Sequence, residues 1–148
     1  MADDPGEDPL ADLADLILNV SRLVRARTPA GAEVVPLTET ERQVMRVIDL
    51  YPGSAPSDIA HRTRLQRTNV STALRSLENK GMIVRSATSG RGIAVTATER
   101  AAVNLQTLRS AWSHELGDVL HDELDAVRQC NQLLSRLEQR LTNNETPE

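Results

Sequence analysis

Residues 56–97 read PSDIAHRTRLQRTNVSTALRSLENKGMIVRSATSGRGIAVTA, and this stretch determines the architecture of the chain. Pro56 suits the first turn of a short helix, which we expect to end near Thr63. After a tight connection, apolar residues at helical spacing predict a second helix over residues 67–80. Gly81 comes next, and glycine is the preferred residue just beyond a helix C-cap.

The second half of the stretch predicts a β-hairpin. Residues 82–88 and 93–97 have the composition of two short strands, and residues 89–92, Ser-Gly-Arg-Gly, form the turn between them. Two closely connected helices followed by a hairpin are typical of a helix-turn-helix with a wing. The expected fold class is therefore mainly α with a small β-hairpin wing, in which a winged helix-turn-helix adjoins a helical dimerisation region.

The flanking residues predict further helices. Apolar residues at helical spacing begin at Leu10, and that helix should end near Thr28. Thr38 and Glu41 have the spacing of a capping box that opens another helix. A long helical region follows the hairpin, with a break near residues 117–121.

We divide the chain into an acidic disordered tail (1–8), a first dimerisation helix with its connector (9–36), a winged helix-turn-helix DNA-binding region (37–97), C-terminal dimerisation helices (98–141) and a disordered tail (142–148).

Size and composition exclude several classes of protein. The chain has 148 residues, a usual size for one domain, of which 39% are hydrophobic and 26% charged. No apolar run approaches the ~18 residues that a membrane span needs. Residues 1–9 lack the basic start and apolar stretch of a secretory signal. A single cysteine, Cys130, excludes an intramolecular disulfide, and we expect a cytoplasmic protein with no membrane contact.

Charge is distributed unevenly along the chain. The formal net charge is −4, yet residues 61–100 hold eight basic and two acidic residues, a local excess of +6. Such a basic block can bind phosphates even on an acidic chain. One tryptophan, one tyrosine and no phenylalanine leave almost no aromatic platform for stacking single-stranded bases. Double-stranded DNA is therefore the expected nucleic-acid partner.

The helix predicted over residues 67–80 has two distinct faces. At about 100° per residue, one side collects only apolar residues and should face the core: Val70, Ala73, Leu74 and Leu77. The opposite side carries hydroxyl, amide and guanidinium groups without an acid, and these groups can bond base edges and phosphates in a major groove. A solvated face of scattered arginines is the alternative. The predicted groove contacts are Arg67, Thr68, Asn69, Ser71, Thr72 and Arg75.

Arg91 lies between Gly90 and Gly92 at the tip of the predicted hairpin. Flanking glycines permit a tight and narrow loop. An arginine at such a tip can enter a minor groove, where narrow A·T tracts concentrate negative potential. An ordinary exposed turn arginine is the alternative. Because the hairpin follows an acid-poor helix, we favour the groove contact.

This pattern resembles the winged helix-turn-helix repressors of the multiple-antibiotic-resistance (MarR) family over residues 37–96. The chain departs from the family pattern at Thr72, Ser89 and Glu99, where the family commonly has an arginine, an acid and a glycine. The residues that carry the resemblance are Leu37, Thr38, Glu41, Val44 and Met45 in the second helix, Ser57, Asp58, Ile59 and Ala60 in the third, Leu65, Thr68, Val70, Ser71, Leu77, Glu78, Gly81, Met82 and Ile83 around the fourth, and Val84, Arg85, Arg91, Val95 and Thr96 in the wing.

The resemblance implies a homodimer in which the first, fifth and sixth helices intertwine. It also implies release from DNA by a small ligand bound between the winged and dimerisation regions, although only Tyr51 and Trp112 could supply aromatic walls. Independently, apolar residues recur at spacings of three and four near the C-terminus, as in paired helices, or in a helix packed within one chain. This seam consists of Leu120, Leu124, Val127, Cys130, Leu134, Leu137 and Leu141.

The predicted function is a dimeric, sequence-specific DNA-binding transcriptional regulator, a repressor of a pseudo-palindromic operator, with no enzymatic activity, cofactor or metal. One alternative is a winged-helix module that binds proteins without DNA specificity. Another is a metal-dependent regulator that uses His114, His121 and nearby acids. Cys130 is interpreted as a small apolar residue of the seam and not as a redox sensor.

Overall fold

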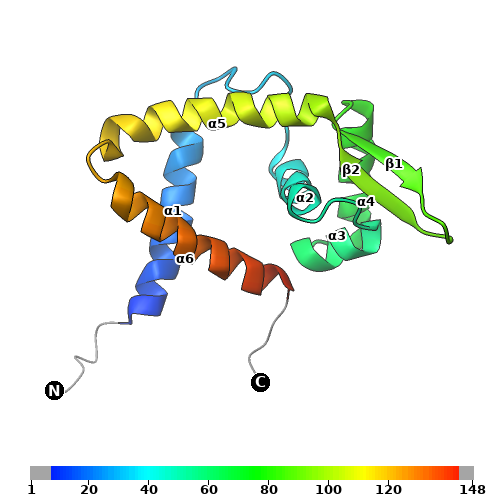
Figure 1. The fold of residues 1–148 in the computed structure, drawn as a ribbon, viewed down its shortest axis with the longest axis horizontal. Helices are drawn as coiled ribbons and strands as arrows, with labels where there is room; N and C mark the ends of the chain where they lie inside the picture. Colours follow the sequence, from blue (N-terminus) through cyan, green and yellow to red (C-terminus); the bar gives the residue numbers. More distant parts are fainter. Residues whose placement is uncertain (1–7, 144–148) are drawn as a thin grey trace.

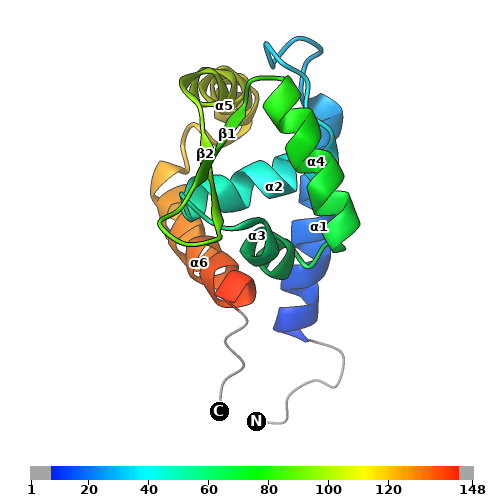
Figure 2. The ribbon, with the colours of Figure 1, turned by 90° about the vertical axis from the view of Figure 1, so that its right-hand side faces the viewer.

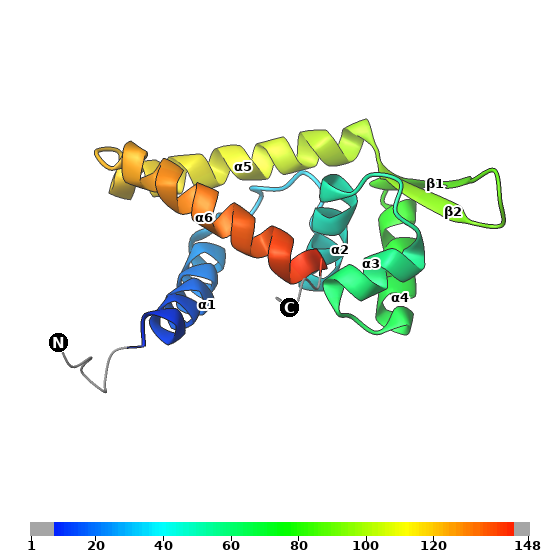
Figure 3. The same ribbon diagram turned by 60° about the horizontal axis from the view of Figure 1, so that its bottom comes forward.

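The computed structural model describes residues 8–143, and its fold confirms a mainly helical chain with a two-stranded antiparallel hairpin. A winged helix-turn-helix occupies one end of the molecule, and α5 runs from it to the opposite end (Figure 1). There α6 turns back below α5 toward the winged end (Figure 3). Helix α1 crosses α6 in the view of Figure 1. The elements are α1 (Pro9–Arg27), α2 (Glu39–Leu50), α3 (Pro56–Thr63), α4 (Arg67–Asn79), β1 (Ile83–Ala87), β2 (Ile93–Ala97), α5 (Glu99–Leu120) and α6 (Leu124–Asn143).

The core lies in the winged region, where α2, α3, α4 and the hairpin pack together. Aliphatic residues and methionine fill it, as the composition requires. The most deeply buried side chains are Ile48, Ile59, Leu74, Leu77, Met82, Ile83, Val44, Val70 and Val95. Full burial of one such side chain stabilises the fold by about 1.5–3 kcal/mol. This core gives α4 a rigid base.

Local signals in the sequence set the ends of α2 and α4. The capping box at the start of α2 is formed: Thr38 accepts from the Glu41 amide, and Glu41 accepts from the Thr38 amide. At the end of α4, Gly81 has φ 73° and donates to the Glu78 carbonyl. The Met82 amide then donates to the Leu77 carbonyl. This arrangement is a Schellman motif, which explains the glycine.

Some element boundaries differ from the sequence expectation. The break between α5 and α6 falls at residues 121–123, after Gly117, which lies inside α5. Asp8, which we placed in the disordered N-terminal tail, caps α1 by accepting from the amides of residues 10 and 11. At the other end α6 continues through Asn143. The rest of the two predicted tails, residues 1–7 and 144–148, lies outside the described residues.

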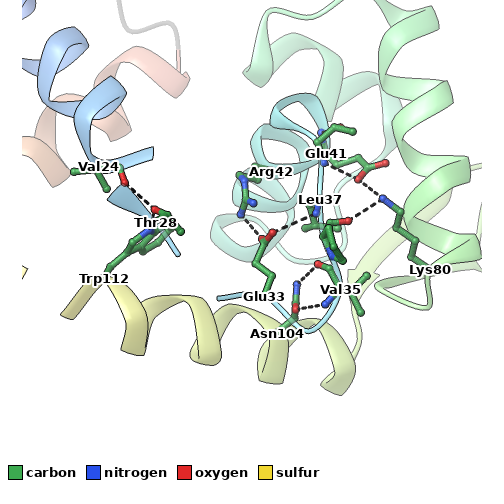
Figure 4. Close-up of polar contacts among 12 residues, drawn as sticks. Val24, Thr28, Glu33, Val35, Leu37, Glu41, Arg42, Lys80, Asn104 and Trp112 are labelled. Carbon is green, nitrogen blue, oxygen red and sulfur yellow. Dashed lines mark hydrogen bonds and ion pairs between the residues drawn. The ribbon is translucent and has the colours of Figure 1, made fainter. Parts of the chain in front are cut away.

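The connector between α1 and α2 is fastened to α5. Asn104 is 3% exposed, and its side chain bonds both the amide and the carbonyl of Val35, at 2.8 and 2.9 Å (Figure 4). Farther along α5, Trp112 Nε1 donates to Thr28 Oγ1 at 3.0 Å. These bonds satisfy buried polar groups of an irregular segment, which would otherwise be costly to bury. They hold the winged region and α5 in one arrangement.

The helices outside the winged region bury little of their apolar surface. Neither α1 nor α6 has a buried residue in the single chain. Cys130, which we expected to behave as an apolar residue of the seam, is exposed here. None of the helices in residues 8–143 is both long enough and apolar enough to cross a bilayer.

Candidate nucleic-acid interface

Helix α4 has the two faces that the sequence predicts. All four apolar residues assigned to the inner face are buried, namely Val70, Ala73, Leu74 and Leu77. All six residues assigned to the outer face or its N-terminal edge are exposed, namely Arg67, Thr68, Asn69, Ser71, Thr72 and Arg75. Their polar groups therefore reach solvent along one side of a helix that the core holds in place.

The N-terminal end of α4 is open to an anion. Its N-cap, Gln66, forms no side-chain cap, and the first turn carries no acidic residue. The amides of a first helical turn point outward and carry partial positive charge, so they favour a phosphate. On the exposed face one hydroxyl is already engaged, because Thr72 Oγ1 donates to the Thr68 carbonyl at 3.0 Å.

The wing lies beside α4 at the same end of the molecule (Figure 2). Its strands pair in register, with Arg85 opposite Val95, and Thr88 donates its amide to the Gly92 carbonyl at 3.0 Å to close the loop. A Cβ on residue 92 would approach Thr88 Oγ1 to 2.9 Å, so a larger residue there would require the Thr88 side chain to shift. Arg91 is exposed at the tip.

Two contacts that the sequence did not predict support the wing. Ser54, in the loop between α2 and α3, forms a bridge with Val95 and accepts its amide at 3.0 Å. At the base of the hairpin, Arg85 pairs with Glu78 of α4 at 3.2 Å. That pair joins Glu78, the acid next to the exposed face of α4, to a cation of the wing.

The basic block is smaller at the surface than in the sequence. Lys80 pairs with Glu41, and Arg85 with Glu78, so neither cation is available to a ligand. Within the described part of the chain, no acid forms an ion pair with Arg67, Arg75 or Arg91. These three arginines therefore provide unneutralised charge on α4 and on the wing.

A buried carboxylate links α2 to α4. Glu41 is 4% exposed and accepts from Ser76 Oγ at 2.6 Å. It also accepts from Lys80 Nζ at 2.7 Å (Figure 4). Burial raises the pKa of Glu41, but the hydrogen bonds from its neighbours outweigh that effect and leave the pKa below its ordinary 4.5. The same carboxylate thus caps α2 and fixes the C-terminal half of α4.

The hollows outside this interface include two that border the winged region. One, of about 300 Å³, lies between α2 and α5 and has Met45, Leu108 and Trp112 among its apolar walls and Arg42, Arg46 and Arg109 among its cations. The other is an open groove of about 1440 Å³ between α5, α6 and the winged region. Val127, Leu134, Leu137 and Leu141 of the predicted seam line this groove.

The residues of the metal alternative do not assemble into a ligand set. His114 lies exposed on α5, and His121 follows that helix and contacts Asp122 at 3.1 Å. Within residues 8–143, no three histidine, cysteine, aspartate or glutamate side chains gather as a metal site.

The short α3, the exposed α4 and the braced hairpin define a winged helix-turn-helix protein. Residues 35–92 match the model of the MarR family. Over these residues the chain is similar to the MarR family, as the sequence pattern predicts.

Curated relatives and solved structures are similar to the chain beyond this stretch. The HTH-type transcriptional repressor Rv2887 of Mycobacterium tuberculosis is 29% identical over 92 residues, which span 61% of this chain and 66% of that protein, just under two thirds of its length. A putative transcriptional regulator from Pseudomonas aeruginosa is 26% identical, with a TM-score of 0.69 over 88% of this chain and 92% of the other. The structure of Rv2887 with p-aminosalicylic acid is 23% identical, with a TM-score of 0.59 over 84% and 97% of the two chains.

Proposed function

We propose that the protein is a transcriptional repressor that binds a specific sequence in double-stranded DNA as a homodimer. The observation that carries this proposal is the exposed face of α4, which holds polar and basic groups without an acid, together with a wing whose tip carries an arginine that forms no ion pair within the described residues. The curated relatives are named transcriptional repressors, which supports the same function. The proposal includes no catalytic step and no cofactor.

In the proposed complex, α4 lies in the major groove and the wing reaches the adjacent minor groove. Arg75 has the length and the two-pronged donor geometry to bond guanine O6 and N7. Arg91 meets the backbone or a narrow minor groove, where it adds affinity more than base discrimination. The remaining proposed contacts, to base edges or phosphates, come from Arg67, Thr68, Asn69, Ser71 and Thr72.

The proposed dimer rests on apolar surface that a single chain leaves uncovered. Helices α1 and α6 have no buried residue, and large aliphatic side chains such as Leu18 and Leu124 are 71% and 54% exposed. The open groove of about 1440 Å³ exceeds the ~300–1,000 Å³ typical of small-molecule pockets. Helices of a second copy fit its size, and its lining offers them apolar side chains such as Leu134 and Leu137 among polar ones. A two-fold dimer would read half-sites about one helical turn apart, ~10 bp centre to centre.

We further propose that a small molecule regulates DNA binding from the cavity between α2 and α5. Its volume of about 300 Å³ suits a small ligand, and its walls combine apolar side chains with Arg109, with Asp49 and with Arg42 and Arg46, which pair with Glu33 and Glu138. A related protein was crystallised with p-aminosalicylic acid, which shows that a ligand of that size binds a MarR-family relative. The α2 wall of this cavity also carries the core that supports α4.

The decisive experiment selects binding sites for the full chain from random duplex DNA. Enrichment of an inverted repeat, bound by a dimer in solution, is the expected result. Failure to enrich any sequence would favour the alternative of a winged-helix module that binds proteins, which the net charge of −4 leaves open. Enrichment of one asymmetric half-site by a monomer would contradict the dimer and keep the DNA partner.

A further inference from the structure

We infer that a clasp between the winged region and the end of α6 sets the distance between the two reading helices of a dimer. The reading helix is α4, which would contact DNA in each subunit. The clasp consists of Arg46, Tyr51 and Arg62 on the winged side and of Glu138 and Asn143 on α6. Its residues are positioning residues, because none of them lies on the proposed DNA-binding face. The inference rests on the proposed dimeric DNA-binding function.

The first half of the clasp is a two-pronged ion pair. Arg46 Nε and Nη2 of α2 donate to Glu138 Oε1 and Oε2 of α6, both at 2.7 Å. These hydrogen bonds hold the pKa of Glu138 below its ordinary value. A bidentate guanidinium–carboxylate contact fixes orientation as well as distance, since two parallel bonds resist rotation.

The second half of the clasp lies one and a half turns farther along α6. Asn143 Oδ1 accepts from Tyr51 Oη at 3.0 Å and from Arg62 Nη1 at 2.6 Å. The Arg62 guanidinium also stacks on the Tyr51 ring, 3.7 Å from its centre. Two separate points of attachment, about 7.5 Å apart along the helix, determine the direction in which α6 crosses the winged region.

The clasp acts on α4 through α2. Arg46 and Glu41 lie on the same helix, and Glu41 is bonded to Ser76 and Lys80 at the C-terminal half of α4. An orientation imposed at Arg46 is therefore passed to the reading helix as part of one rigid, core-packed unit. In Figures 1 and 3 the end of α6 meets the winged region on the side away from α5, so the two helices hold that region from opposite sides.

Without the clasp, the winged region remains attached only on the side of α5 and of the connector from α1. Its links there are the chain at Thr98, the two bonds between Asn104 and Val35, and the pair of Arg25 with Glu39 at 3.1 Å. Rocking about those links would carry α4 toward or away from the reading helix of the partner subunit. Because Arg46 and Glu138 are 55% and 33% exposed, salt should weaken the clasp without unfolding the chain.

The test measures affinity for a series of DNA duplexes that carry the selected half-sites at their best spacing and at spacings one base pair shorter or longer. Glu138→Gln removes the charge of the clasp. Asp125→Asn is the matched control, because it changes net charge equally and breaks a pair with Arg128 inside α6. Asn143→Ala removes the second point of attachment. Thermal melting and sedimentation check that each variant is folded and dimeric.

The wild type should prefer its best spacing, and Glu138→Gln should reduce that preference by about three- to tenfold. Asn143→Ala should reduce it as well, and Asp125→Asn should leave it unchanged. Higher salt should broaden the spacing preference of the wild type toward that of Glu138→Gln. An unchanged profile in folded, dimeric Glu138→Gln, or equal broadening in Asp125→Asn, would overturn the inference. Absence of paired-site binding by the wild type would instead refute the proposed function.

Discussion

Lys80 Nζ lies 2.7 Å from Glu41 Oε2, so the only lysine of the chain forms an ion pair with a buried carboxylate. It also donates to the Pro36 carbonyl at 3.1 Å. The reading helix is thus tied at its C-terminal end to the start of α2. A cation that composition alone assigns to the basic surface proves to be structural.

Glu41→Gln should make the free energy of unfolding less dependent on pH in the acidic range. The pKa of Glu41 lies below 4.5 in the folded chain, so its ionised form stabilises the fold above that pH. This contribution is lost as the pH falls from about 4.5 through the lowered folded pKa. The variant should lose about 1–3 kcal/mol of unfolding free energy at pH 7, measured by urea denaturation. Equal pH slopes below pH 5 for both proteins would contradict the assignment.

Arg75→Ala should relax base preference at one position of each half-site. Loss of a bidentate contact to guanine costs about 1–3 kcal/mol for the preferred base and much less for the others. Affinities for single-base variants of the selected site measure this effect. Arg136→Ala, on exposed α6, removes an equal charge as the control. A uniform loss across all bases would show that Arg75 binds phosphate.

Arg91→Ala should weaken binding to most sequences alike. A wing-tip arginine meets the backbone or minor groove, so its removal should flatten the dependence of affinity on salt by about one counterion per subunit. Titrations at several salt concentrations give that slope. Changed preference at central half-site bases would mean that the wing reads the major groove. Neither arginine variant should alter the melting temperature, since both side chains are exposed.

Leu134→Asp should dissociate the proposed dimer. Leu134 lines the open groove, and a carboxylate there would be buried against the apolar helices of the partner subunit. We expect the dimer dissociation constant to rise ~100-fold or more, an effect of about 3 kcal/mol, as measured by sedimentation. Gln132→Asp, at an exposed position of the same helix, should have little effect. A dimer that survives Leu134→Asp would place the interface elsewhere.

The local features of the fold could be predicted from the sequence because their signals lie within a few residues. The inner face of α4, the capping box at Thr38 and the glycine at residue 81 all follow from spacing alone. The break before α6 lies a few residues later than the sequence predicts, because glycine at residue 117 is tolerated inside a long helix at a modest cost in free energy.

The long-range polar contacts could not be predicted. Arg46 and Glu138 are separated by 92 residues, and nothing in their neighbourhoods distinguishes them from other surface charges. The bridge from Ser54 to Val95 involves a single residue outside any strand and leaves no periodic pattern. For the same reason the basic block contributes less free positive charge to the surface than the sequence indicates. The carboxylate partners of Lys80 and Arg85 can be recognised only in the folded chain.

The pairing of Lys80 with Glu41 has a consequence for chemical control of the protein. Every basic side chain on the outer face of α4 and at the wing tip is a guanidinium, which keeps its charge at any physiological pH and has no amine to acylate. Lysine acetyltransferases therefore have no substrate at this surface. The charge that this surface offers to the proposed DNA partner is thus insensitive to lysine acetylation.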